Sequence, residues 1–227
     1  MTLIIPDIHN KFEKAEKIIK RLCPEKVIFL GDYFDDFYDD RFIARDVAHW
    51  LRDSLYIKNR IHLRGNHDLC YETEGNYCSG WEQDKDREIN GIMRRKDWDK
   101  LEWYVYEGTW LLTHAGFTNH LYRSSKVFPI VRNFLNFAIL KADESLRERC
   151  GHWLYNAGKL RGGHQRYGGI LWCDIREFEP IPGTKQIFGH TPQEIKPLKI
   201  NKDNYCLDTH LKHVMMLYDD KVKIVKI

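Results

Sequence analysis

The chain has 227 residues, 43% of them hydrophobic and 30% charged, with a formal net charge of +3. This composition excludes a disordered chain, and the length leads us to expect one domain spanning residues 1–227. The small net charge, with both signs interspersed, argues against a nucleic-acid partner. No apolar run approaches the roughly 20 residues of a membrane helix, and the first apolar run is too short for a signal peptide. We therefore expect a cytoplasmic protein without a membrane partner.

The first part of the chain alternates predicted strands and helices. Apolar runs at Thr2–Ile5 and 27–30 end at turn-forming residues and predict buried strands. Between them, apolar side chains recur at helical spacing over 12–22, so this β-α-β unit favours a parallel pair with a right-handed crossover. A helix at about 41–55 and a strand at 60–63 follow.

The middle of the chain predicts a loop and two helices. Residues 72–84 are polar and contain glycines and aromatics, which predicts a long surface loop. A helix at about 85–101, a strand at 109–113 and a helix at about 127–149 come next. The segment 158–169 holds five glycines and is either a loop near the site or a flexible connection.

From residue 170 the sequence predicts mainly strands, with a tight turn at Asp219 and Asp220. An α/β first part followed by a mostly antiparallel end predicts an α/β fold of two packed mixed β-sheets flanked by helices. The expected strands cover residues 170–173, 185–188, 205–207, 214–218 and 222–225.

The cysteines form neither a Cys-x-x-Cys pair nor a zinc-finger spacing. We therefore expect reduced, mostly buried thiols rather than a redox motif or a thiolate metal site. The six residues are Cys23, Cys70, Cys78, Cys150, Cys173 and Cys206.

Five of the predicted strands are followed by side chains that can bind metal. Open α/β sheets gather ligands at the carboxyl ends of their strands, so these five endings can converge on one crevice. Carboxylates, an amide and imidazoles without thiolates suit first-row divalent ions, and manganese, iron or zinc would be tolerated. A carboxylate, for which Asp32 is the first candidate, can bridge two ions about 3.5–4 Å apart that activate water and clamp a phosphoryl group. The candidate ligands are Asp7, His9, Asp32, Asn66, His114 and His190.

An ordered set of motifs resembles the calcineurin-like metallophosphoesterases, a family with a four-layer sandwich fold. The closest branch resembles the PPP-type Ser/Thr protein phosphatases and their bacterial and phage relatives, which include diadenosine tetraphosphate hydrolases. The motifs are Asp7-Ile8-His9, Gly31-Asp32-Tyr33-Phe34-Asp35, Leu63-Arg64-Gly65-Asn66-His67-Asp68, His114-Ala115-Gly116, Leu171-Trp172-Cys173-Asp174, and Gly189-His190-Thr191-Pro192 followed by Leu207-Asp208-Thr209.

The resemblance implies a role for each motif residue. Asp7, His9 and Asp32 would bind one ion, and Asp32 with Asn66, His114 and His190 would bind the other, with Mn²⁺ expected first. His67 would protonate the leaving oxygen, and Asp35 would accept its other N–H. The resemblance also implies attack by a metal-bound hydroxide without a covalent enzyme intermediate.

One position departs from the family pattern. Asp36 stands where the PPP branch has a phosphate-binding arginine, and residues 37–40 add more acid, which would repel an anionic substrate. A phosphate clamp must therefore come from elsewhere. Arg161 and Arg166 are the candidates. Arg64 is also available, although the resemblance implies a structural ion pair for it.

Several functions are compatible with this site. The leading hypothesis is a phosphate monoesterase acting on a phosphoprotein or a small phosphorylated metabolite or nucleotide. Hydrolysis of dinucleoside polyphosphates is the alternative, favoured by the compact length and the Gly-His-Thr-Pro motif. A phosphodiesterase or nuclease is less favoured, because such branches usually carry Gly-His-x-His and Pro192 occupies the last position here. An inactive scaffold would typically lack ligands, and the set is complete.

Overall fold

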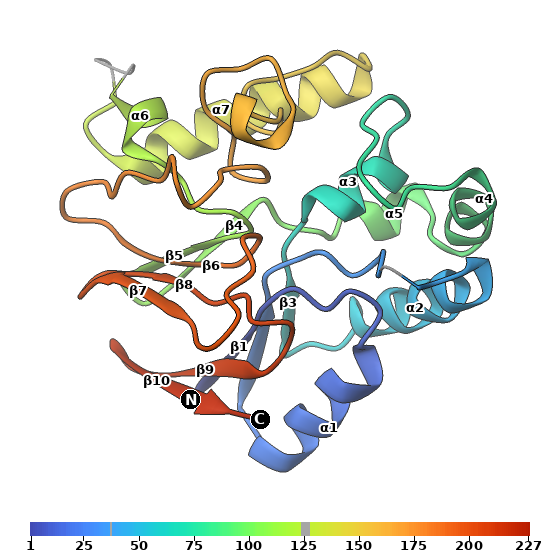
Figure 1. Ribbon diagram of the computed structural model, residues 1–227, viewed down its shortest axis with the longest axis horizontal. Coiled ribbons are helices and arrows are strands. Elements are labelled where there is room, and N and C mark those ends of the chain that lie inside the picture. The colour runs from blue at the N-terminus through green and yellow to red at the C-terminus, as the bar shows by residue number, and fades with distance from the viewer. Residues whose placement is uncertain (37, 124–127) are drawn as a thin grey trace.

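The computed structural model describes residues 1–36, 38–123 and 128–227 (Figure 1). Two five-stranded mixed sheets form its centre, in the orders β10-β9-β1-β2-β3 and β4-β5-β6-β8-β7. The strands are β1 (Thr2–Ile5), β2 (Lys26–Phe29), β3 (Arg60–His62), β4 (Tyr104–Glu107), β5 (Trp110–Thr113), β6 (Lys185–Phe188), β7 (Leu198–Asn201), β8 (Asn204–Cys206), β9 (His213–Tyr218) and β10 (Lys221–Lys226).

Helices cover the outer faces of the sheets. The longest are α1 (Phe12–Leu22), α2 (Arg41–Ser54) and α7 (Val131–Arg147). Figure 1 shows α1 and α2 beside the first sheet and α7 beyond the second. The shorter helices are α3 (Asn66–Glu72), α4 (Gln83–Ile92), α5 (Arg95–Trp98), α6 (Asn119–Tyr122) and the 3₁₀ turn η1 (Lys159–Arg161).

The alternation of side chains along β1 explains the layers. Leu3 and Ile5 pack in one core cluster with residues of α1 and α2, whereas Ile4 packs in another with Leu112 and Ile187 of the second sheet. Successive residues of a strand point to opposite faces, so β1 is buried on both sides. A third cluster joins α7 to the outer face of the second sheet. The predicted two-sheet α/β sandwich is thus confirmed.

The parallel pairing of β1 with β2 is also confirmed, with Leu3 opposite Val27. Other details differ. Residues 170–173, expected as a strand, form no strand. The carboxyl-terminal part is mostly antiparallel, as expected, because β9 pairs in this way with β1 and β10, and β7 with β8. Only β6 departs from this pattern, since it pairs in parallel with both β5 and β8. The expected helix 85–101 is two helices, α4 and α5, and the sequence did not predict α3, β4 or β7.

Two predicted positions lie outside the described residues. They are the start of the expected helix at Val127 and Phe37, with which the segment 37–40 begins. The six cysteines are free, as expected, but only Cys70, Cys173 and Cys206 are buried. In the described ranges no helix combines the length and the apolar character needed to cross a bilayer.

Candidate metal centre

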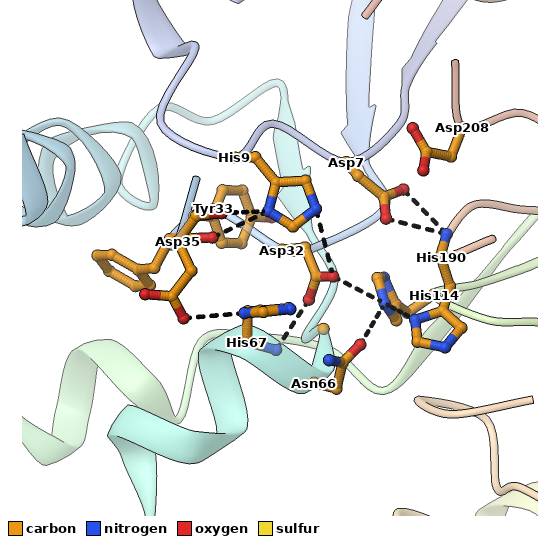
Figure 2. Close-up of polar contacts among 12 residues, drawn as sticks. Asp7, His9, Asp32, Tyr33, Asp35, Asn66, His67, His114, His190 and Asp208 are labelled. Carbon is orange, nitrogen blue, oxygen red and sulfur yellow. Dashed lines mark hydrogen bonds and ion pairs between the residues drawn. The ribbon is translucent and has the colours of Figure 1, made fainter. Parts of the chain in front are cut away.

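The carboxyl ends of five strands meet at one site, as the sequence predicted (Figure 2). Asp7 and His9 follow β1, Asp32 follows β2, and the remaining candidate ligands follow β3, β5 and β6. β1 and β2 belong to one sheet and β5 and β6 to the other, so the site lies where the two sheets come together.

One half of the site gathers three side chains around His114. Its Nε2 lies 3.3 Å from Asp32 Oδ2, 3.0 Å from Asn66 Oδ1 and 3.1 Å from His190 Nδ1. All four residues are buried. Asp32, His114 and His190 form a group whose ligand atoms lie within 4.8 Å of one another, which is close enough to surround one ion.

The other half of the site is built on the same Asp32. Asp7, His9 and Asp32 form a second group of ligand atoms within 4.8 Å of one another. His9 Nε2 lies 3.9 Å from Asp32 Oδ2. The Asp7 carboxylate accepts the backbone N–H of His190 at 2.9 Å, which ties the two halves together. Asp32 is therefore the carboxylate common to both groups.

Backbone carbonyls set the tautomers of two of the imidazoles. His114 Nδ1 lies 2.9 Å from the Leu30 carbonyl, and His9 Nδ1 lies 2.7 Å from the Asp35 carbonyl. A carbonyl only accepts, so each Nδ1 is the donor and Nε2 is the ring nitrogen that faces Asp32. This is the arrangement in which a histidine binds metal through one nitrogen while the other is held by a hydrogen bond.

Tight backbone turns bring the side chains this close. Asp32 and His190 have positive φ angles of 51° and 68°, a strained conformation for residues with a side chain. Gly189 is required beside them, because a Cβ there would lie 2.0 Å from Asp7 Oδ1. The strand-end turns therefore accept local strain in order to place ligand atoms.

The charges of the site are unbalanced without a cation. Burial, and then the neighbouring Asp208, raise the pKa of Asp7 to about 7. Burial opposes ionisation of Asp32 too, but His114 above all lowers its pKa well below the usual range. Because burial alone disfavours a charged ring, the raised pKa of His114, about 9, reflects the Asp32 carboxylate beside it.

The residues fit divalent metal. Asp32 Oδ2 and Asn66 Oδ1 are acceptors that face His114 Nε2, which becomes a third acceptor when a cation displaces its proton. His190 Nε2 and Asp208 Oδ2 are buried and have no hydrogen-bond partner among the described residues. Buried acceptors without donors are costly, and cations satisfy them. The sequence analysis did not select Asp208, although it follows β8 as the other candidates follow their strands.

His67 and Asp35 lie beside Asp32 (Figure 2). His67 donates its backbone N–H to Asp32 Oδ1 at 2.9 Å, and its Nδ1 lies 2.8 Å from Asp35 Oδ2. Burial acts against the charged ring, yet the carboxylates of Asp32 and Asp35 raise the pKa of His67 well above its usual value. His67 is therefore protonated at neutral pH, and its Nδ1–H donates to Asp35.

Two residues that the sequence analysis did not select hold Asp35. Its Oδ1 accepts from the Tyr71 hydroxyl at 2.6 Å and from Lys85 Nζ at 2.8 Å. Lys85 also contacts Asp39, and its side chain is 1% exposed. The sequence carried no signal for this role, because Lys85 stands on a mostly polar helix where lysine is ordinarily exposed.

The acidic stretch after Asp35 is compensated by neighbouring groups. Asp36 pairs with Lys11 at 2.8 Å, and Asp39 pairs with Lys85 at 3.0 Å. Asp40 caps α2 by accepting the backbone N–H groups of Phe42 and Ile43. These carboxylates are engaged locally, so the expected repulsion of an anionic substrate is reduced.

The three candidate arginines lie in different surroundings. Arg161 donates to Thr191 Oγ1 at 3.0 Å, directly after His190, and its Nε lies 2.8 Å from Asp174. Arg166 stacks on Tyr167. Arg64 is 3% exposed and makes a two-pronged contact with Glu72, which is the structural ion pair that the resemblance implied. Of the three, Arg161 is the one with a contact that ties it to the metal centre.

The two-sheet fold and the carboxylate–imidazole centre define a metal-dependent hydrolase. The model of the calcineurin-like phosphoesterase family matches residues 2–194, and the chain belongs to this family. It is therefore a phosphoric ester hydrolase of a divalent-metal-dependent family. No curated protein matches the sequence.

Solved structures share the fold at low sequence identity. A cold-active protein-tyrosine phosphatase of a psychrophilic Shewanella is 15% identical, with a TM-score of 0.55, covering 99% of this chain and 80% of that one. A Saccharomyces cerevisiae protein serine/threonine phosphatase is 11% identical, with a TM-score of 0.52, covering 100% and 79%. A protein provisionally assigned as a diadenosine tetraphosphatase is 12% identical, with a TM-score of 0.51, covering 99% and 92%.

Proposed function

We propose that this protein is a phosphate monoesterase that works with two divalent ions. The observation that carries the proposal is the position of Asp32, which belongs to both groups of ligand atoms and also accepts the backbone N–H of His67. One ion would be held by Asp7, His9 and Asp32. The other would be held by Asp32, Asn66, His114 and His190.

The donor chemistry favours manganese, with iron and zinc tolerated. The set contains carboxylate and amide oxygens and imidazole nitrogens but no thiolate, which suits borderline and hard first-row ions. When bound, such a pair lowers the pKa of water and offsets the negative charge of the phosphoryl group. The remaining work falls to the protein's own side chains.

His67 is the proposed proton donor to the leaving oxygen. Its Nδ1–H is engaged by Asp35, so Nε2–H is the group available to a substrate. Asp35 stays ionised: burial opposes this, but hydrogen bonds from His67, Lys85 and Tyr71 lower the pKa of the carboxyl. A protonated imidazole in a fixed orientation supplies the proton as the ester bond breaks.

Arg161 is the proposed contact for the phosphoryl oxygens. It lies on the second sheet's side of the centre, where it pairs with Asp174 and donates to Thr191. A guanidinium suits this task because its fork of donors matches phosphate geometry. The local pairing of Asp36 and Asp39 and the helix-capping role of Asp40 weaken the main objection to an anionic monoester.

Hydrolysis of dinucleoside polyphosphates is the alternative. The match to the provisionally assigned diadenosine tetraphosphatase supports it, because this match covers 92% of that chain and the two chains are therefore similar in length. Both reactions would use the same centre. They differ in whether the leaving group is an alcohol or a nucleotide.

A substrate panel with a His67 variant tests the proposal. The manganese-loaded protein is assayed on 4-nitrophenyl phosphate, a phosphoserine peptide, diadenosine tetraphosphate and a phosphodiester. The expected order places the monoesters first. For His67→Asn we expect kcat to fall about 10²–10⁴-fold on the phosphoserine peptide, whose alkoxide needs a proton, and less on the aryl ester. Metal content should stay unchanged.

His49 on α2 is exposed and provides the matched control. His49→Asn should behave as the parent. Equal losses on alkyl and aryl esters in His67→Asn would contradict the role as proton donor. Faster turnover of diadenosine tetraphosphate than of both monoesters would establish the alternative.

A further inference from the structure

Two cysteines that are separate in sequence meet beside the His67–Asp35 pair. Cys70 lies on α3, one turn after His67, and Cys78 lies in the irregular segment that joins α3 to α4. The segment folds back so that the two Sγ atoms lie 2.8 Å apart. Cys70 is buried and Cys78 is partly exposed.

Cys78 also contacts both members of that pair. Its Sγ lies 3.4 Å from His67 Nδ1 and 3.8 Å from Asp35 Oδ2. Cys70 Sγ donates to the His67 carbonyl at 3.1 Å. The thiol pair is therefore linked to the backbone and to the ring of the same histidine.

We propose that Cys70 and Cys78 form a reversible disulfide in response to peroxides, and that this bond switches off the neighbouring His67. The carrying observation is the contact between the two sulfur atoms and their shared contacts with His67. The effect on turnover rests on the proposed function of His67, whereas formation of the bond does not.

The two thiols are suited to different steps. The hydrogen bond from Cys70, and then the contact with His67, lower the pKa of the Cys78 thiol against the effect of burial. Burial raises the pKa of the Cys70 thiol well above its usual value. Because the thiolate is the nucleophile, the partly exposed Cys78 is the first to react and Cys70 is the resolving thiol.

The chemistry balances with one peroxide. The Cys78 thiolate attacks a peroxide oxygen, the O–O bond breaks, and the leaving hydroxide takes a proton to become water, which leaves a sulfenic acid. Cys70 sulfur then attacks Cys78 sulfur and expels a second water. Two thiols lose two electrons and two protons, and hydrogen peroxide is reduced to two molecules of water.

A third metal at this place is less favoured. Asp35, Cys70 and Cys78 form a group of ligand atoms within 4.8 Å of one another. However, Lys85 Nζ already lies 2.8 Å from Asp35 Oδ1, and the His67 ring lies on its Oδ2. A further cation would add positive charge next to two positively charged groups.

Bond formation moves atoms that touch His67. The sulfur separation must shrink from 2.8 Å to about 2.0 Å, and Cys78 carries most of the change because Cys70 is fixed in a helix. The contact of Cys78 with the imidazole and with Asp35 shifts with it. Since a misplacement of about 1 Å can cost about 100-fold in rate, we expect kcat to fall at least about tenfold.

The experiment follows the bond and the rate in the same samples. The full-length, manganese-loaded protein is titrated with hydrogen peroxide, quenched with catalase and blocked with an alkylating reagent. Glu72 and Glu74 lie between the two cysteines, so cleavage after glutamate separates them unless the disulfide holds the peptides together. The rate of 4-nitrophenyl phosphate hydrolysis is measured before and after dithiothreitol.

The expected result is a linked Cys70–Cys78 peptide that forms before the exposed Cys23 and Cys150 are oxidised. The fall in kcat should track the linked peptide and be reversed by dithiothreitol. In Cys70→Ala no linked peptide can form, so excess peroxide should oxidise Cys78 past the sulfenic acid to the sulfinic acid, which dithiothreitol does not reduce. Cys23→Ala, the matched control, should respond as the parent does.

Three outcomes overturn the proposal. Cys70 and Cys78 could both remain alkylatable after Cys23 and Cys150 have been oxidised, or dithiothreitol could rescue Cys70→Ala from excess peroxide as fully as it rescues the parent. A linked peptide with unchanged kcat would overturn the switch. If the untreated protein has no phosphatase activity, the proposed function fails, and the linked peptide alone still decides whether the disulfide forms.

Discussion

Lys85→Met removes the cation from a buried cluster of charges. Lys85 Nζ lies 2.8 Å from Asp35 Oδ1 and 3.0 Å from Asp39 Oδ1, and the lysine and aspartate side chains are 1%, 3% and 5% exposed. Methionine keeps the apolar stem but leaves two buried carboxylates without their partner. Removing one member of a buried ion pair costs about 3–5 kcal/mol, so we expect the free energy of unfolding to fall by about this amount.

The assay is urea unfolding followed by tryptophan fluorescence at one fixed Mn²⁺ concentration, because bound metal itself stabilises the folded state. For a chain of this size, about 2–4 °C of Tm accompany each kcal/mol, so a fall of about 6–20 °C is expected. Lys141→Met is the control: Lys141 makes an exposed pair with Glu144 on α7, and its loss should leave the midpoint nearly unchanged.

A second substitution makes the test stricter. Adding Asp39→Asn to Lys85→Met removes one of the two buried charges that lose Lys85 as a partner and should recover part of the lost stability. The reasoning is refuted if Lys85→Met unfolds within about 1 kcal/mol of the parent, or if Asp39→Asn destabilises the double variant further. In either case the contacts of Lys85 would not be those of a buried ion pair.

Three further predictions concern substrate, pH and metal. Arg161→Met should raise KM for 4-nitrophenyl phosphate about tenfold or more, whereas a larger effect of Arg166→Met would contradict the assignment of the phosphate contact. Burial, and then Arg60, lower the pKa of His62 to about 3, so this ring stays neutral in the fold but takes a proton when unfolded below about pH 6.5. The free energy of unfolding should therefore fall as pH drops from about 6.5 to 3, by up to about 1.4 kcal/mol per pH unit. In urea titrations, His62→Gln should not show this part of the pH dependence. Asp7 holds a proton below about pH 7, and His114 holds one below about pH 9. Mn²⁺ binding should therefore release more protons at pH 6 than at pH 9. Calorimetry in buffers of different ionisation enthalpy measures the number of protons released. Equal release at both pH values would contradict the place of these two groups in the centre.

Local patterns in the sequence were enough to predict the elements that position the site. The runs Thr2–Ile5 and 27–30 are short, apolar and stopped by Pro6 and Gly31, so β1, β2 and the helix between them could be predicted. The convergence of strand ends followed from topology, because parallel strands present their carboxyl ends at one edge. The stretch 170–173 was wrongly predicted as a strand because it is a short apolar run. In the fold it forms no strand, and its apolar side chains pack against distant residues instead.

Long-range contacts could not be predicted from the sequence. Lys85 stands in a polar helix that gave no sign of burial, and its two partners lie 46 and 50 residues away. Cys70 and Cys78 are eight positions apart without a recognisable metal or redox spacing, and only the path of the intervening segment brings them together. Side-chain partners across a fold depend on tertiary packing rather than on local propensity.

The central claim is that Asp32 serves two ions at once, and metal stoichiometry tests it most directly. Manganese retained after gel filtration should be two ions per chain in the parent, one in His9→Asn, and almost none in Asp32→Asn, with all three proteins folded by circular dichroism. One ion in the parent, or equal retention by Asp32→Asn and His9→Asn, would contradict a shared carboxylate at this centre.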